Sequence, residues 1–140
     1  MLIQLACPAD AKALVRLNAA FNGVDDVSAA DVRRSLEASG EIVVVAVEDG
    51  TPVAFCCAQV HHSFCYAAPV AEITEMYVDA AFRRQGCAQD MLNFLEAHLR
   101  QQYGVDEIHL LTGTENHPAQ SAYQKAGFAI KEEVYMVKTL

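Results

Sequence analysis

The stretch EITEMYVDAAFRRQGCAQD, residues 72–90, joins a strand-like run to a basic, glycine-containing turn and then to the start of a helix. A turn that enters a helix presents unpaired backbone N–H groups and the positive end of the helix dipole, which together suit an anionic phosphate group. Gly86 and Ala88 leave the backbone accessible, while Arg83 and Arg84 add positive charge to a chain whose net charge is -8. We interpret the turn as a phosphate-binding site; an ordinary solvated turn fits these six residues equally well.

The rest of the chain supplies alternating strand and helix patterns around this turn. Strands are predicted at 2–6, on both sides of the Asp49-Gly50 hairpin signal within 41–60, at 71–78, at 106–112, and as two short strands within 128–140. Helices are predicted at 8–21, at 29–39 with Ser28 as N-cap and Gly40 after its end, from Ala88 onward, and at 117–126 closed by Gly127. The order β-α-α-β-β-β-α-β-α-β-β predicts an α/β (α+β) fold with a mixed central sheet of about seven strands flanked by about four helices.

Composition limits the class of protein. A chain of 140 residues that is 53% hydrophobic fits one domain, which we take as residues 1–140. We expect a cytoplasmic protein that does not bind membranes, because no apolar run approaches the roughly 20 residues that span a bilayer. The negative charge argues against nucleic-acid binding. The five cysteines include no C-x-x-C pair, so neither a disulfide framework nor a zinc site is indicated.

Two motifs together resemble the GNAT superfamily of acyl-CoA N-acyltransferases. The family pattern [RQ]-x-x-G-x-[GA] corresponds to Arg83-Arg84-Gln85-Gly86-Cys87-Ala88, preceded by the strand residues Met76-Tyr77-Val78. A second pattern corresponds to NHPAQSAYQKAGF, which contains Asn116, Ala119, Tyr123, Gly127 and Phe128. The resemblance covers nearly the whole chain and implies an acetyltransferase that uses acetyl-CoA as co-substrate and no metal.

The resemblance also implies where the co-substrate lies. The backbone of residues 83–89, which ends at Gln89, would hold the pyrophosphate of coenzyme A, and the strand through Met76 and Val78 would pair with the pantetheine arm. Asn116 would contact that arm from the opposite wall. In the family the fourth strand carries a bulge and separates from the fifth. Glu75 interrupts the alternation that Glu72 and Thr74 share, as an extra residue in the strand would make it do.

Three side chains are candidates for the chemistry of thioester aminolysis, which needs a neutral amine and a proton for the departing thiolate. Glu72 matches the strand position where family members keep a base, and Glu75 is its competitor; both are alternatively solvated or structural carboxylates. Tyr123 matches the family tyrosine that protonates the thiolate, and a core tyrosine is the alternative.

Other reactive residues carry weaker patterns. Cys56 and Cys57 suggest a thiol nucleophile, but no histidine partner is recognisable and core packing is favoured. His61, His62 and Cys65 fit no common metal-ligand spacing, so the rim of a loop is favoured. His117 is interpreted as a helix-start residue.

The acceptor is expected to be an amine. The loop 21–27, with Asp25 and Asp26, and the loop 61–69 would flank the acceptor site, and with Glu72 and Glu75 they would attract a cation. We therefore expect a primary amine on a cationic small molecule, with a protein or peptide amine, or a non-catalytic acyl-CoA sensor, as alternatives. The apolar run VYMV, 134–137, suggests a homodimer interface.

Overall fold

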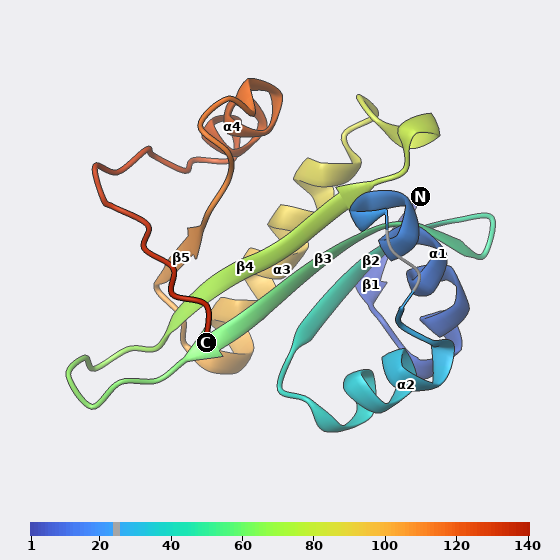
Figure 1. Ribbon diagram of the computed structural model, residues 1–140, viewed down its shortest axis with the longest axis horizontal. Coiled ribbons are helices and arrows are strands. Elements are labelled where there is room, and N and C mark those ends of the chain that lie inside the picture. The colour runs from blue at the N-terminus through green and yellow to red at the C-terminus, as the bar shows by residue number, and fades with distance from the viewer. Residues whose placement is uncertain (24–25) are drawn as a thin grey trace.

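The computed structural model describes residues 1–23 and 26–140 and contains one twisted sheet with helices on both of its faces (Figure 1). The strands are β1 (Leu2–Leu5), β2 (Ile42–Glu48), β3 (Thr51–His61), β4 (Val70–Val78) and β5 (Glu107–Leu110). The helices are α1 (Ala11–Asn22), α2 (Ala29–Ala38), α3 (Cys87–Tyr103) and α4 (His117–Lys125), with short 3₁₀ turns at Pro8–Asp10 and Ala80–Phe82. The strands lie in the order β1-β2-β3-β4-β5, antiparallel up to β4 and parallel between β4 and β5.

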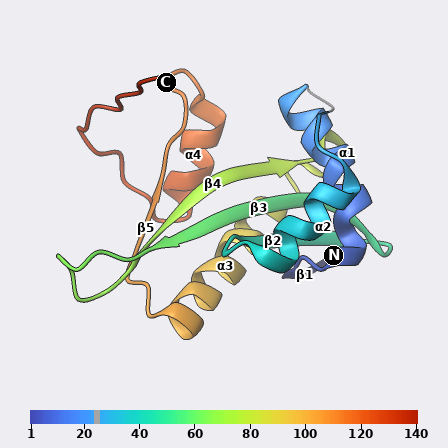
Figure 2. The same ribbon diagram turned by 60° about the horizontal axis from the view of Figure 1, so that its bottom comes forward.

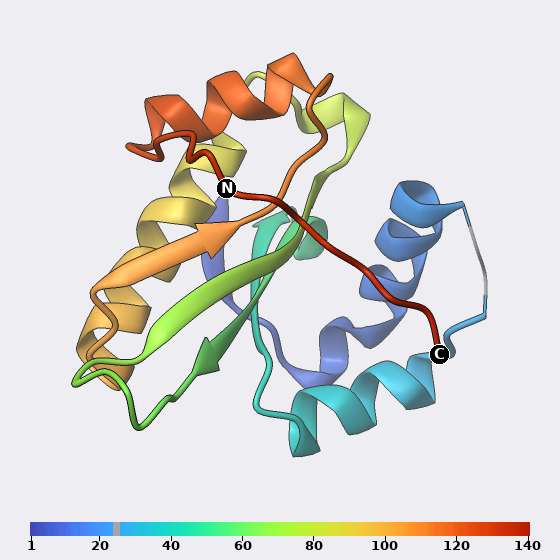
Figure 3. The ribbon, with the colours of Figure 1, turned by 60° about the vertical axis from the view of Figure 1, so that its left-hand side comes forward.

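The prediction of about seven strands is wrong, because the sheet formed by the described residues has five. The first nine elements follow the predicted order, but residues 128–140 form neither of the two predicted strands. This segment leaves α4 as an extended chain (Figures 1 and 3), and Ile130, Val134 and Met136 in it are 70%, 86% and 84% exposed. Alternating apolar residues favour a strand, but a strand also needs a neighbouring edge, and this segment pairs with none in the described chain.

Two apolar clusters separate the faces of the sheet. On one face α3 packs against Val44, Cys56 and Ile73 through a stripe that includes Leu95 and Leu99. The other face carries α1 and α2 (Figure 2). There Leu17 packs in one cluster with Val45 and Phe55. The run from Val43 to Ala46 is buried on both faces, which explains why its sequence is continuously apolar instead of alternating.

Several local predictions are confirmed. Ser28 and Asp31 form the capping box of α2. Asp49 and Gly50 both have positive φ, 48° and 75°, as the tight hairpin turn between β2 and β3 requires. Gly127, with φ 95°, ends α4. Gly40 does not have the left-handed conformation expected after α2, because the C-cap Ser39 is already extended.

Within the described residues, no helix is long and apolar enough to cross a membrane.

Candidate active site

Strands β4 and β5 separate halfway along β4. Their pairing begins at Val70 and Glu107 and ends at Ile73 and Leu110, whereas β4 continues to Val78. Residues 74–78 therefore have β3 on one side and no paired strand on the other within the described chain. This leaves an edge whose backbone groups are available to an extended ligand, in the manner of an added strand.

A β-bulge lies where the two strands separate. Cys57 pairs with Glu75 and Ala58 pairs with Ile73, so that Thr74 is an extra residue in β4. The interruption that the sequence shows at Glu75 is thus a bulge.

The bulge determines which face the two candidate bases occupy. Residues three apart in a regular strand point to opposite faces, but the extra residue restores Glu72 and Glu75 to the same face. That face is the one that carries α1 and α2, because Tyr77 and Cys57 pack in its apolar cluster. Glu72 is hydrogen-bonded to His61, with 3.2 Å between His61 Nε2 and Glu72 Oε2.

The basic turn has the backbone conformation of an anion site. Arg84 and Gly86 both have positive φ, 61° and 85°, and Gly86 is the N-cap of α3 with no side-chain cap. None of the turn, loop and cap hydrogen bonds of the described chain uses the N–H groups of residues 84–89. A Cβ built at Gly86 would meet Asp90 Oδ2 at 3.9 Å, so the space on the Cβ side of Gly86 is open. The turn therefore fits a phosphate group.

The side chains of the turn lie around this backbone. Arg83 Nε donates to the Val78 carbonyl at 3.0 Å, and its guanidinium lies 5.6 Å from the centre of the Tyr77 ring. Arg84 is exposed, and Gln85 donates to the Ala81 carbonyl.

The first turn of α3 combines buried and accessible groups. Cys87 is buried in the core, where burial and then the charge of Asp90 raise the pKa of its thiol. Ala88 and Gln89 are half-buried.

Helix α4 contributes the second motif. The Asn116 side chain is the N-cap of α4, because its Oδ1 accepts from the Ala119 N–H at 3.3 Å. Tyr123 packs against the α3-side cluster and edge-on against Phe128, at 5.7 Å between ring centres. Burial raises the pKa of Tyr123 to about 12, so its hydroxyl keeps its proton at neutral pH.

A cavity of about 370 Å³ lies between α1, α2 and the sheet. Its apolar lining consists of Leu14, Val27, Val32, Leu36, Val43 and Phe55. Its polar lining consists of Asn18, Asp31, Ser35, Glu41, Cys57 and Glu75. Because Glu75 belongs both to this cavity and to the unpaired part of β4, the cavity and the open edge meet at the bulge. Glu72 does not line the cavity.

Glu41 lines the larger cavity, although the sequence did not single it out as a candidate. Burial, and then the negative charge of Glu41, raise the pKa of the Cys57 thiol, and Glu75 adds a smaller effect of the same sign. The two carboxylates therefore lie near one thiol. The signal was present in the sequence, because Glu41 has the same parity as Val43 and Val45 in β2, whose side chains face α1 and α2.

The cysteines of β3 are packing residues. Cys56 is fully buried, and burial raises the pKa of its thiol to about 12, which removes the thiolate that a nucleophile needs. Burial also raises the pKa of the Cys57 thiol, so this side chain keeps its proton as well.

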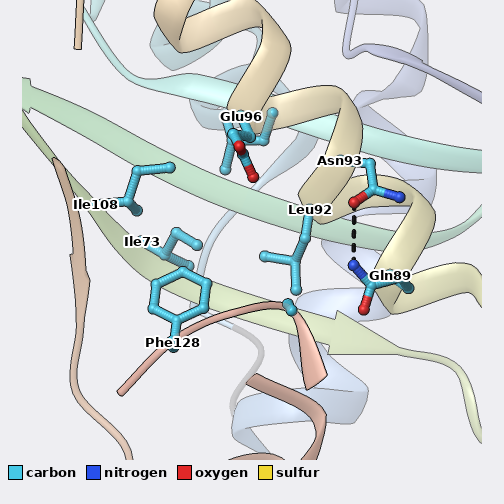
Figure 4. A pocket seen from close by; sticks show the side chains of 9 residues that line it. Ile73, Gln89, Leu92, Asn93, Glu96, Ile108 and Phe128 are labelled. Atoms are coloured by element: carbon cyan, nitrogen blue, oxygen red, sulfur yellow. Dashed lines mark hydrogen bonds between the residues drawn. The ribbon is translucent and has the colours of Figure 1, made fainter. Parts of the chain in front are cut away.

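A second, much smaller cavity of about 30 Å³ lies between α3 and the sheet, beside Ile73, Leu92 and Phe128 (Figure 4). Gln89 and Asn93 at its edge are hydrogen-bonded to each other at 3.0 Å. Its volume is that of about one water molecule.

The predicted loop residues contribute little to the larger cavity. Asp25 lies outside the described residues, and Asp26 does not line the cavity. His61 contacts Glu72, while Cys65 is exposed. The described residues contain no group of three histidine, cysteine or acidic side chains that could hold a metal ion. His117 is the first residue of α4, as interpreted from the sequence.

Comparisons with known proteins agree with this geometry. The model of the acetyltransferase (GNAT) family matches residues 13–128, so the chain belongs to this family and is an acetyl-CoA-dependent N-acyltransferase. Comparison with curated protein sequences finds no significant match.

Solved structures share the fold at low sequence identity. One similar structure is an aminoglycoside acetyltransferase from an uncultured soil metagenomic sample, with a TM-score of 0.86, 20% identity, and coverage of 99% of this chain and 95% of that one. Another is the aminoglycoside N-acetyltransferase AAC(6')-Iy in complex with CoA, with a TM-score of 0.83 and 22% identity; the match covers 99% of this chain and 99% of that one. A third is a ribosomal-protein-alanine N-acetyltransferase from Brucella melitensis biovar Abortus 2308, with a TM-score of 0.83 and 16% identity; the match covers 99% of this chain and 100% of that one.

Proposed function

We propose that this protein transfers an acetyl group from acetyl-CoA to the primary amine of a cationic small molecule, by direct attack while both substrates are bound. The observation that supports this proposal most is the meeting of two features at Glu75: the unpaired edge of β4 and the 370 Å³ cavity that carries carboxylates. An extended donor on the edge and an amine in the cavity would be brought together at the bulge.

The donor side uses the backbone of β4 and of the basic turn. The pantetheine arm pairs with β4 along Met76, Tyr77 and Val78. The N–H groups of residues 83–89 hold the pyrophosphate, because they lie at the positive end of the α3 dipole and lack internal partners among the described hydrogen bonds. Arg83 and Arg84 add long-range attraction for the phosphates. Asn116 and Ala119, at the start of α4, form the opposite wall.

The acceptor side needs a base. Bound acetyl-CoA supplies an acetyl group activated as a thioester. Glu75 lies in the cavity and takes the proton of the acceptor ammonium; Glu72, on the same face but engaged by His61, is the alternative acting through water. Tyr123 gives its proton to the leaving sulfur, since its raised pKa keeps the hydroxyl protonated. The nitrogen–carbon bond forms as the carbon–sulfur bond breaks. The second proton that the nitrogen loses restores the Tyr123 hydroxyl through solvent, and Glu75 returns its proton to water.

The test follows thiol release from acetyl-CoA with a panel of amines, together with calorimetric binding of coenzyme A. We expect binding, and release that depends on the amine and is lowered in both Glu75→Gln and Tyr123→Phe. Tight binding without release for any amine would favour the acyl-CoA sensor, and release only with peptides would favour the protein acetyltransferase. The absence of coenzyme A binding would refute all three.

We also propose a homodimer in which the segment 128–140 packs on a second copy of the chain. The exposed apolar residues Val134, Tyr135, Met136 and Val137 support it, together with the position of β5 at the end of the sheet. Light scattering of the intact chain should give twice the monomer mass, and Val134→Asp combined with Met136→Asp should give the monomer. A monomeric intact chain would refute the dimer without affecting the proposed activity.

A further inference from the structure

We infer that the acceptor is a monoamine carried on an apolar body, an alkyl or arylalkyl amine, whose ammonium group binds between Glu41 and Glu75. The inference rests on the proposed function, because it assigns the 370 Å³ cavity to the acceptor. It goes beyond that function by distinguishing this amine class from the polyhydroxylated amines of aminoglycosides.

The charges of the cavity suit one cationic centre. Three acidic side chains line it, but the carboxylate of Asp31 caps α2 and pairs with Arg34, and these contacts hold the pKa of Asp31 below its usual range. Glu41 and Glu75 have no ion-pair partner among the described residues, and both act on the Cys57 thiol. The uncompensated negative charge is therefore concentrated at one end of the cavity.

The other walls of the cavity are apolar. Val32 and Leu36 come from α2, Leu14 from α1, and Val43 and Phe55 from the sheet. Phe55 lies next to Phe21 and Tyr77, with 6.2 Å between its ring centre and each of theirs, so this wall is part of an aromatic cluster. Such a surface stabilises a hydrocarbon body by about 25 cal/mol for each Å² removed from water.

Hydroxyl groups find few partners here. Away from the carboxylates, the uncharged polar side chains of the lining are those of Asn18 and Ser35, apart from the Cys57 thiol. Each buried hydroxyl without a partner costs about 1–3 kcal/mol, so a sugar-like acceptor would bind poorly. The volume is near the lower end of the roughly 300–1,000 Å³ range of small-molecule sites, which suits a single ring or a short chain better than several linked rings.

The test compares kcat/KM for 2-phenylethylamine and hexylamine with that for sisomicin and spermidine. We expect the two apolar monoamines to be at least about tenfold better, a difference of about 1.4 kcal/mol. Equal or better turnover of sisomicin or spermidine would overturn the inference while leaving the proposed function intact. Release with none of the amines, despite coenzyme A binding, would overturn both.

Matched variants locate the ammonium site. Glu41→Gln should raise KM for 2-phenylethylamine at least about tenfold with coenzyme A affinity unchanged, because a charged hydrogen bond is worth about 1.5–3 kcal/mol. Glu37→Gln removes the same charge from the exposed part of α2 and should change nothing. Leu36→Ala should lower kcat/KM for 2-phenylethylamine but not for methylamine, which has no body to contact the wall. Equal effects of Glu41→Gln and Glu37→Gln, or an unaffected Leu36→Ala, would refute the proposed binding mode.

Discussion

Replacement of Gly86 by alanine separates the backbone geometry of the basic turn from its part in ligand binding. Gly86 has φ 85°, and a left-handed conformation costs an L-residue about 1–2 kcal/mol. A Cβ there would project into the open space above the start of α3, where its only neighbour is Asp90 Oδ2 at 3.9 Å. The fold can therefore accept the methyl group, but a phosphate would have to share its position.

The expected loss of affinity follows from the contact that the methyl group displaces. A hydrogen bond to a charged group contributes about 1.5–3 kcal/mol, so the loss of one should weaken coenzyme A binding about 10- to 100-fold. Isothermal titration calorimetry on the folded variant measures this directly.

Gly104 provides the matched control. It has φ 66° and caps the far end of α3, roughly 25 Å away at 1.5 Å per residue. Gly104→Ala should lose the same stability in urea unfolding as Gly86→Ala, yet bind coenzyme A as the unmodified chain does. If both variants bind within about twofold of each other, the assignment of the pyrophosphate to this turn is refuted.

Three further predictions concern β4 and α4. Tyr123→Phe should lower kcat about 10²- to 10⁴-fold with coenzyme A affinity nearly unchanged. The pKa of Tyr123 is raised to about 12 in the folded chain from the ordinary value of 10, so the unfolded chain loses this proton first as the pH rises. The free energy of unfolding should therefore fall between pH 10 and 12, and it should fall more in the unmodified chain than in the variant. Deletion of Thr74 should lower turnover by removing the bulge and the bend it gives β4, although Glu72 and Glu75, then two residues apart, would stay on one face. Thr74→Val keeps the extra residue and should retain turnover, and equal turnover in the two variants would contradict the role of the bulge. Asn116→Ala should cost about 0.5–2 kcal/mol in urea unfolding through loss of the α4 N-cap and Asn116→Ser much less, and equal losses would exclude the cap.

Much of the site backbone could be predicted because it depends on neighbouring residues. The glycine at the start of α3, the Ser28 cap of α2 and the Asp49-Gly50 hairpin each need only a few consecutive side chains and a limited set of backbone angles. The sequence also showed where the alternation of β4 is interrupted, at Glu75, but the bulge itself is established only by the pairing of β4 with β3.

The other features depend on pairing between distant segments. Residues 128–140 have the alternation of a strand, but whether they join a sheet depends on an edge elsewhere, and the five-stranded sheet does not include them. The cavity brings together Glu41, which precedes β2, Glu75 from β4 and Leu36 from α2. The sequence by itself determined the turn, the caps and the candidate residues, because short-range sterics and hydrogen bonds decide them. Only the tertiary structure decided which carboxylates share a cavity, because side-chain burial depends on segments that are far apart in the chain.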